Sequence, residues 1–152
     1  MSMDTIDKKL IGLLSEDSKR SLADMGAVVG LSASSVNERI RRLTESGAIR
    51  RFTVELDPEA LGVPTLVFVW IALRENAEEA FFKRFAAAHP MILECHHVTG
   101  GWSYLIKIRV GSTREIEAFL DELKEHQFLG RSETVIVLSS AVPGSFVRKA
   151  VG

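Results

Sequence analysis

The sequence is poor in cysteine, has no long apolar run and is nearly neutral. Its single cysteine, Cys95, excludes an intrachain disulfide and a CxxC redox or zinc motif, which is typical of a reducing compartment. The longest apolar run, residues 63–73, is too short to span a bilayer, and the first residues do not resemble a signal peptide. We therefore expect a soluble, cytoplasmic protein with no membrane partner.

The near balance of charge restricts where a nucleic acid can bind. The 19 Lys and Arg residues against 20 Asp and Glu residues leave a formal net charge of -1, so the chain is not basic overall as many DNA-binding domains are. Any nucleic-acid surface must therefore be local. The 152 residues are 46% apolar, which allows either one domain with a generous core or two small domains.

Three helices are expected within about the first fifty residues, beginning with one over residues 6–14. The third carries Val36, Ile40 and Leu43 at helical spacing, which predicts one apolar stripe facing a core. Side chains that can cap a helix precede each segment, and glycines that can take the left-handed conformation follow the second and third. The expected caps are Asp4 or Thr5, Ser21 and Ser32, and the expected helix-ending glycines are Gly30 and Gly47.

A strand and a linker are expected after the third helix. Residues 49–56 alternate in polarity and are rich in β-branched and aromatic side chains, which indicates a strand leaving the helical part. Asp57 caps well and Pro58 is pre-set for a first helical position, so one helical turn should follow. Gly62 and Pro64 close this turn.

The rest of the chain alternates strand and helix. Residues 65–73 are nearly all apolar, as expected of a strand buried on both faces. Two further strands, residues 92–98 and 104–110, flank a glycine turn and predict a hairpin, and a last strand is expected over residues 133–139. Helices should begin at Asn76 with Glu79 and at Ser112 with Glu115, with inward stripes of Phe81, Phe85 and Ala88 and of Ile116, Phe119, Leu120 and Leu123.

The predicted fold class is α+β. A three-helix winged helix-turn-helix over residues 1–50 is followed by a strand and linker over residues 51–64. Residues 65–140 form a βαββαβ ferredoxin-like domain. Residues 141–152 form a tail with too little pattern to assign.

The third helix is the candidate DNA-reading element. With its apolar stripe inward, the opposite side presents hydroxyl, amide and charged side chains. Residues near the start of such a helix enter the major groove first, whereas arginines farther along more readily meet phosphates. The candidates are Ser34, Ser35, Asn37 and Glu38 for base edges, Arg41, Arg42, Arg50 and Arg51 for phosphates, and Ser32 and Arg39 beside them.

An alternative is that these charges form an ordinary solvated helix face, with Glu38 paired to Arg42 four residues later. The local charge favours the DNA interpretation, because residues 39–51 contain five arginines and one acid, Glu45, for a local charge of 5 minus 1, or +4. This pattern alone leaves both interpretations open.

Several motifs occur in a fixed order along the chain. The helical part contains IDKKL at 6–10, VGLSASSV at 29–36, RIRRL at 39–43 and SGAI at 46–49. The later part contains LDPEALG at 56–62, LECHHVTG at 93–100 and SYL at 103–105. On these motifs the chain resembles the Lrp/AsnC family, also called feast/famine regulators, over about residues 4–138.

The resemblance implies a transcriptional regulator rather than an enzyme, with no catalytic residue, metal or cofactor. It implies a homodimer formed through the βαββαβ domains, often assembled into tetramers or octamers, with an amino-acid-like effector bound between dimers. A dimer presents two recognition helices, so the expected partner is a double-stranded, pseudo-palindromic operator whose half-sites lie about one helical turn or a multiple apart.

The resemblance also assigns the effector to the glycine turn of the hairpin and to the last strand. Free amides at such a turn can hold a carboxylate. Relatives commonly have an acidic residue just after the Thr-Gly pair, where this chain has Gly101 and Trp102, so an α-amino group lacks an obvious carboxylate partner there. The effector candidates are Thr99, Gly100, Gly101, Trp102, Ser103, Glu133, Thr134 and Ile136.

Three competing interpretations rest on other residues. Cys95, His96 and His97 suggest a metal, but neighbouring strand residues face opposite ways, so only Cys95 and His97 can share a face. An enzyme would draw acid-base groups from Tyr104, His96 and Glu94, although no nucleophile and base stand at a recognisable spacing. A binding module without DNA would use Trp70, Phe81, Phe82 and Phe85 as interface residues, although aromatics at this spacing are more often core.

Overall fold

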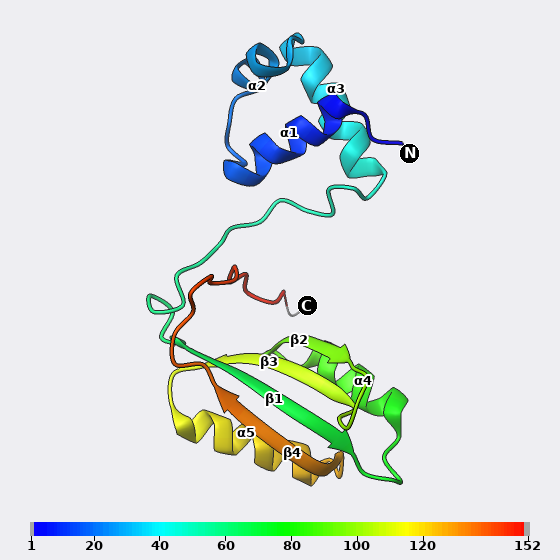
Figure 1. Cartoon of the computed structure of the whole chain (residues 1–152), viewed down its shortest axis with the longest axis vertical. Coiled ribbons are helices and arrows are strands. Elements are labelled where there is room, and N and C mark those ends of the chain that lie inside the picture. Colours follow the sequence, from blue (N-terminus) through cyan, green and yellow to red (C-terminus); the bar gives the residue numbers. More distant parts are fainter. Residues whose placement is uncertain (1, 151–152) are drawn as a thin grey trace. The chain divides into compact units, whose positions relative to one another are not determined.

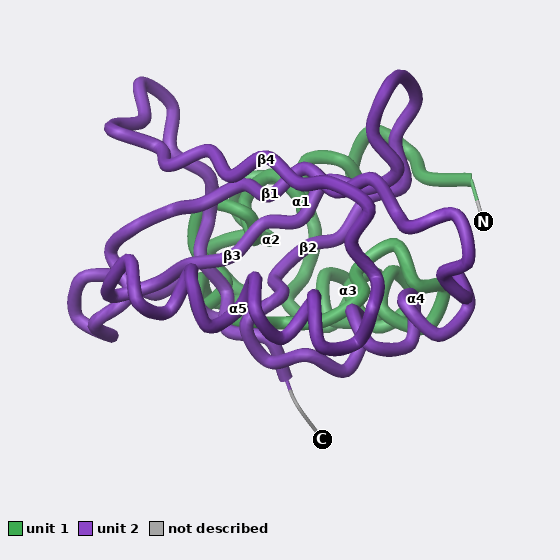
Figure 2. Tube along the Cα trace, turned by 90° about the horizontal axis from the view of Figure 1, so that it is seen from below, with its two compact units in different colours: residues 1–53 green, residues 54–152 purple. Residues whose placement is uncertain are grey.

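The structure, a computed structural model, describes residues 2–150. The chain divides into two compact units, residues 1–53 and residues 54–152, which Figure 2 shows in different colours. The described part of unit 1 is helical and unit 2 combines a sheet with two helices, so the α+β class is confirmed. Across the described residues, each helix is too short or too polar to cross a membrane.

Unit 1 consists of α1 (Thr5–Glu16), α2 (Leu22–Val29) and α3 (Ala33–Glu45). The predicted caps are confirmed, and of the two alternatives for α1 the cap is Asp4, whose carboxylate accepts from the Asp7 amide at 2.8 Å. Gly30 and Gly47, which follow α2 and α3, are left-handed with φ 74° and 79°. The core of the three helices centres on Leu10, Met25 and Val36, all at most 1% exposed.

The predicted strand over residues 49–56 is not formed. The described chain is irregular there, with Phe52 53% and Val54 64% exposed. A strand needs a partner strand to satisfy its backbone groups, and none of the four strands among the described residues pairs with this segment. Unit 1 therefore has no wing among the described residues.

The segment that begins at Asp57 forms a hydrogen-bonded turn rather than a helical one. The Asp57 carboxylate accepts from the Glu59 amide at 3.0 Å, and the Val63 amide donates to the Pro58 carbonyl at 2.9 Å. Gly62 is left-handed, with φ 72°, and redirects the chain into the sheet.

Unit 2 has the predicted βαββαβ order. Its antiparallel sheet runs in the order β2-β3-β1-β4, and both helices pack on the same face of it (Figure 1). β4 starts and ends earlier than predicted. The elements are β1 (Thr65–Leu73), α4 (Glu79–Ala88), β2 (Ile92–His97), β3 (Tyr104–Val110), α5 (Thr113–Glu125) and β4 (Leu129–Ile136).

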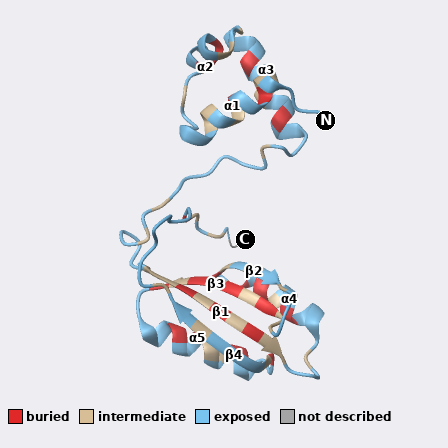
Figure 3. Cartoon of the chain, in the orientation of Figure 1, coloured by how far each residue is buried: buried red, intermediate tan, exposed pale blue. Residues whose placement is uncertain are grey.

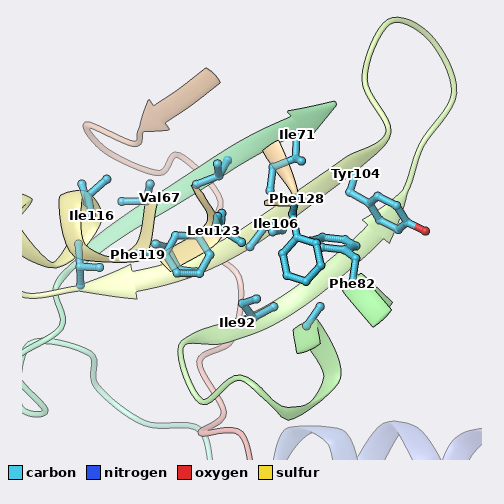
Figure 4. Close-up of a cluster of buried hydrophobic side chains, with 14 residues drawn as sticks. Val67, Ile71, Phe82, Ile92, Tyr104, Ile106, Ile116, Phe119, Leu123 and Phe128 are labelled. Carbon is cyan, nitrogen blue, oxygen red and sulfur yellow. The ribbon is translucent and has the colours of Figure 1, made fainter. Parts of the chain in front are cut away.

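The main core lies between the sheet and the two helices. Figure 4 shows Phe82 from α4 and Phe119 and Leu123 from α5 packed against Val67, Ile71 and Ile106 of the strands. These side chains are at most 1% exposed. The predicted inward stripe of α5 is confirmed, with Ile116, Phe119 and Leu123 buried and Leu120 packed against the same core.

The predicted inward stripe of α4 is only partly right, because Phe85 packs against the core but Phe81 and Ala88 are exposed. Phe82 and Ala86 are buried, whereas Phe81 is 42% exposed and Ala88 is exposed. Adjacent phenylalanines at 81 and 82 fit either rotation, so the period alone does not fix which one faces inward. The buried stripe continues to His89, a polar residue whose ring nitrogen Nε2 lies 2.8 Å from the Glu122 carboxylate on α5.

The prediction that β1 is buried on both faces is also wrong within one chain. Val67, Val69 and Ile71 are fully buried, but Phe68 and Trp70 on the other face are only half-buried, because both helices cover the same side (Figure 3). We call the uncovered side the open face of the sheet. By the strand register it carries Leu66, Phe68, Trp70, Ala72, Glu94, His96, Leu105, Lys107, Arg109, Arg131, Glu133 and Val135.

The tail, which the sequence pattern left unassigned, is ordered against unit 2. Phe146 is 6% exposed, and its carbonyl accepts from the Leu56 amide at 2.8 Å. The Lys149 ammonium donates to the carbonyls of Ala86 and His89, both at 2.9 Å, at the end of α4. The free carbonyls at a helix C-terminus favour a cation, so Lys149 stabilises this end of α4.

Candidate functional sites

The turn between α2 and α3 is held by a glycine in the middle of α2. The Gly26 carbonyl accepts from the amides of Gly30 at 2.8 Å and Leu31 at 3.0 Å. A side chain at Gly26 would place its Cβ 2.4 Å from the Leu31 carbonyl oxygen. Only glycine therefore allows α2 to approach the turn this closely. Sequence reasoning identified Gly30 but missed Gly26. The need for glycine at position 26 comes from its contact with the Leu31 carbonyl, which the helix pattern does not reveal.

Three serines define the start of α3. Ser32 Oγ accepts from the Ser35 amide at 3.2 Å and lies 3.1 Å and 2.9 Å from the hydroxyls of Ser34 and Ser35. All three residues are exposed. The first turn of α3 thus presents hydroxyl groups and a helix N-terminus, which together suit hydrogen bonding to phosphates or base edges.

A shallow hollow on α3 brings several predicted residues together. Its volume is about 360 Å³. Val36 and Leu43 on the opposite side of the helix are fully buried, so this surface faces away from the unit 1 core. The lining residues are Leu31, Ser34, Ser35, Glu38, Arg39 and Arg42.

The arginines of α3 differ in their partners. Arg41 forms a bidentate pair with Glu38, at 2.6 and 3.0 Å, and also bonds Glu45. The hydrogen bond from Arg41 is the main reason that the pKa of Glu38 is lowered. The expected alternative pair of Glu38 with Arg42 is not formed, because Arg41 engages both Glu38 oxygens.

Arg39 points back into unit 1. Its guanidinium donates to Asp4 at 2.7 Å and to Asp7 at 2.8 Å, and its side chain is only 20% exposed. By contrast, Arg42, Arg50 and Arg51 make no ion pair with any residue in the described range 2–150 and are exposed. The structure thus separates a guanidinium that ties α3 to α1 from three that are open to solvent.

The glycine turn between β2 and β3 is anchored by Ser103. The Ser103 amide donates to the Ile71 carbonyl at 2.7 Å, and its hydroxyl accepts from the Leu73 amide at 3.2 Å. Gly100 has φ 97°, a conformation that favours glycine. The turn is therefore fixed to the end of β1.

Arg131 contacts this turn, although sequence reasoning missed it. Its guanidinium carbon lies 4.2 Å from the centre of the Trp102 indole, and it donates to the Gly101 carbonyl. Trp102 in turn lies 6.4 Å from Trp70 between ring centres. The predicted last strand began at residue 133, so Arg131 lay outside it and no face could be assigned to its side chain.

The other candidates on β4 lie on two faces. Glu133 stands opposite Trp70 in the register, on the open face. Thr134 and Ile136 stand opposite Val69 and Val67, on the face that the helices cover. The structure therefore groups Glu133, but not Thr134 or Ile136, with the open-face side chains beside the turn.

The side chains around Cys95 alternate between the two faces of the sheet, as predicted. Cys95 and His97 share the helix-covered face, and the His97 ring stacks on Tyr104 at 5.0 Å, whereas His96 lies on the other face beside Glu94 at 3.2 Å. Burial raises the pKa of the Cys95 thiol to about 11. Within residues 2–150 no group of three or more His, Cys, Asp or Glu side chains is placed to hold a metal.

Tyr104 is held by a single strong partner. Its hydroxyl donates to Glu79 at 2.6 Å, and burial together with this hydrogen bond raises the pKa of the phenol. A phenol with a raised pKa stays protonated near neutral pH. The Tyr104 hydroxyl can therefore keep donating to Glu79, and this hydrogen bond fixes α4 to β3.

Comparison with known proteins matches both units to one family. Residues 3–44 match the AsnC-type helix-turn-helix domain, and residues 66–145 match the Lrp/AsnC ligand binding domain. The chain is 36% identical over 138 residues to the HTH-type transcriptional regulator FL11 of Pyrococcus horikoshii, covering 91% of each chain. It is 36% identical over 122 residues to the leucine-responsive regulatory protein of Salmonella typhimurium, covering 79% of this chain and 74% of that one.

A solved structure supports the same assignment. The structure of LrpC of Bacillus subtilis superposes with a TM-score of 0.83 at 29% identity. The match covers 95% of this chain and all of that one.

Proposed function

Because the chain belongs to the Lrp/AsnC family of transcriptional regulators, we propose that it binds a specific double-stranded operator through α3 and a small-molecule effector at the β2–β3 turn. Enzyme activity is not part of this function, since the family consists of regulators. One observation carries the DNA proposal. Two hydroxyls of α3 and Arg42, which makes no ion pair within residues 2–150, line one exposed hollow, while Val36 and Leu43 are fully buried on the other side.

Each predicted side chain has a role in this proposal. Arg42, Arg50 and Arg51 meet phosphates, since they make no ion pair within residues 2–150. Arg39 keeps α3 in place against α1, Ser32 caps the helix, and Arg41, which is paired with Glu38, meets a further phosphate. The side chains that read base edges are Ser34, Ser35, Asn37 and Glu38.

The experiment is selection of bound DNA from a random duplex pool, followed by binding measurements on the enriched site. We expect a pseudo-palindromic motif, because a symmetric dimer presents two copies of α3. Arg42→Ala should weaken binding to that site, while Arg114→Ala, an exposed arginine on α5, is the charge-matched control and should leave it unchanged. A pool that returns no enriched motif would refute specific readout.

We propose further that the open face of the sheet forms the homodimer, which can assemble into tetramers or octamers. Its centre is apolar, with Phe68, Trp70, Leu105 and Val135, and apolar side chains left half-exposed on a sheet favour a second covering layer. Sedimentation velocity tests this. Phe68→Glu should yield monomers, whereas a change at the exposed Arg114 should not.

The effector proposal rests on the anchored glycine turn, with an amino-acid-like ligand as the first candidate. The relative from Salmonella typhimurium is named as leucine-responsive, which concerns that protein. Thermal-shift screening of amino acids and related carboxylates tests whether this chain binds any of them. A flat response across the panel would refute an effector of this kind.

A further inference from the structure

We propose that the linker and the C-terminal tail of unit 2 form a second binding site, which takes a small phosphate monoester with an apolar body. The site is a cavity of about 280 Å³, which we call the linker–tail pocket. Residues from three segments, 61–63, 90–93 and 146–149, line it together with Arg109 and Glu115. The proposal goes beyond the operator and effector proposals and depends on neither.

Hydrogen bonds and close packing hold the walls of the linker–tail pocket together. The Leu56 amide donates to the Phe146 carbonyl at 2.8 Å, which joins the linker to the tail near the start of β1 (Figure 1). On the other side of the pocket, Lys149 joins the tail to the end of α4. The linker also lies close to the chain between β3 and α5, since a Cβ at Gly111 would lie 2.5 Å from the Gly62 carbonyl oxygen. The pocket is therefore built by contacts between distant segments.

The lining of the pocket carries an excess of positive charge. Arg109, Arg148 and Lys149 stand against one acid, Glu115, for a charge of 3 minus 1, or +2. None of the three cations makes an ion pair within residues 2–150. One Glu115 oxygen already accepts from the amides of Gly111 and Ser112, at 2.6 and 2.8 Å. The cations are thus gathered without a carboxylate to neutralise them, which favours an anionic ligand.

Lys149 shows the cost of this arrangement. Two of its three N–H groups donate to the carbonyls of Ala86 and His89, and among residues 2–150 the third has no protein acceptor. Burial lowers the pKa of its ammonium group, because the charge has lost part of its hydration. An anion beside the ammonium would restore a favourable partner for the charged form.

An apolar wall lies beside these cations. Leu61 is 44% exposed, Met91 and Leu93 are half-buried, and the Phe146 ring forms the far side. A bare phosphate ion or a DNA backbone would leave this wall uncovered, whereas a ligand with an apolar body would bury it. The cavity is at the small end of the range for ligand pockets, so the body should be about one ring in size.

The charge of the ligand follows from the charge of the lining. A phosphate monoester carries about −1.5 to −2 charges near neutral pH, which matches +2 better than a single carboxylate does. The guanidinium groups of Arg109 and Arg148 can each bind two oxygens of a phosphate in the bidentate geometry that arginine favours.

The linker–tail pocket lies apart from the two other surfaces that we assign in unit 2. Arg109 stands opposite Leu66, whereas Leu105 stands opposite Trp70 at the centre of the proposed dimer face, about 13 Å farther along the strands. Arg109 belongs to the open face, but its guanidinium is already stacked at 5.5 Å on Phe146 of the same chain. The other lining residues do not belong to the open face. The β2–β3 turn is bonded to the last residues of β1, whereas the pocket adjoins the residues just before β1.

Isothermal titration calorimetry of the full-length protein at constant ionic strength would compare phenyl phosphate, inorganic phosphate and benzyl alcohol. Phenyl phosphate has both parts of the proposed ligand, and each of the other probes has one. We expect phenyl phosphate to bind at least about tenfold more tightly than either, because the cations and the apolar wall act together. Equal affinity for phenyl phosphate and inorganic phosphate would overturn the proposal.

Substitutions separate the two parts of the site. Arg148→Gln, at an exposed position, should weaken both phenyl phosphate and inorganic phosphate by about tenfold. Leu61→Ser should weaken phenyl phosphate by about threefold or more and leave inorganic phosphate unchanged. Arg84→Gln is the matched control, since Arg84 is an exposed arginine of the same unit that lies over Phe81, and it should bind as the parent does. Unchanged phenyl phosphate affinity in Arg148→Gln would overturn the proposal.

Amide hydrogen exchange locates the site without relying on heat. Phenyl phosphate should slow exchange in residues 61–63 and 146–149 and leave residues 99–103 unchanged. Protection of residues 99–103 instead would overturn the proposal and assign the probe to the β2–β3 turn. If phenyl phosphate gives neither heat nor protection while Arg148→Gln lowers operator affinity, the cations contact DNA, so the proposal fails and the operator proposal stands.

Discussion

The Asp7 carboxylate on α1 accepts a hydrogen bond from the Arg39 guanidinium on α3 at 2.8 Å, across 32 residues of chain. Asp7 is 7% exposed, and Arg39 also bonds Asp4, the cap of α1. One guanidinium therefore joins the start of α1 to the middle of α3. The arginine next along the same hollow, Arg42, has no such partner within residues 2–150.

This contrast predicts different consequences for two similar substitutions. Arg39→Ala leaves the nearly buried Asp7 without its partner, so we expect a lower Tm for unit 1. Arg42→Ala should leave the Tm unchanged but lower operator affinity and reduce the slope of log K against log salt by about 1. Scanning calorimetry and binding at several salt concentrations measure both. Equal loss of Tm in the two variants would contradict the assignment.

The glycines of unit 1 offer a second prediction with an internal control. Gly26→Ala should destabilise unit 1 by about 1–3 kcal/mol, because its Cβ would overlap the Leu31 carbonyl at 2.4 Å. Gly12→Ala, inside α1 with no atom within 4 Å of its Cβ, should stabilise by about 0.8–1 kcal/mol through helix propensity. Urea denaturation of both variants checks the signs. Stabilisation by Gly26→Ala would mean that the turn is looser than described.

Local features of this fold were predictable from sequence because their causes lie within a few residues. The Ser21 hydroxyl and the Asp24 amide it caps are three residues apart, and the same holds for Ser32 and Ser35. Gly30 and Gly47 end their helices through their own backbone conformation. The βαββαβ order of elements also followed from the alternation of strand and helix patterns along the chain.

The predictions that were wrong or incomplete depend on contacts between residues that are far apart in the sequence. Whether residues 49–56 form a strand depends on a partner, and the inward side of α4 depends on which of Phe81 and Phe82 meets Tyr104 as well as Phe128. Arg131 was missed because its contact with Gly101 spans 30 residues. In each case the side chain types were visible in sequence, but the distance between elements was not.

The buried phenylalanine of the tail supports a third prediction. Phe146→Ala should lower the free energy of unfolding of unit 2 by about 3 kcal/mol, since the ring is 6% exposed and its removal leaves a cavity. Val142→Ala, in the same tail but 90% exposed, should change it by less than about 0.5 kcal/mol. Urea denaturation measures both. No effect of Phe146→Ala would mean that the tail does not pack on unit 2 in solution.

The thiol of Cys95 provides the last prediction. Because the chain has one cysteine, any labelled thiol is that of Cys95. Burial raises its pKa to about 11, above the ordinary thiol value of about 8.5.

Only the thiolate reacts with iodoacetamide, so at pH 7.5 the native protein should label on the order of a hundredfold more slowly than the same chain in urea. The native rate should then rise about tenfold per pH unit toward pH 11. Between the two pKa values the unfolded chain has lost the proton and the folded chain has kept it, so the thiol's contribution to stability should fall as pH rises through this window. Mass spectrometry of labelled protein gives the rates. A native rate that levels off near pH 8.5 would show that Cys95 is open to solvent.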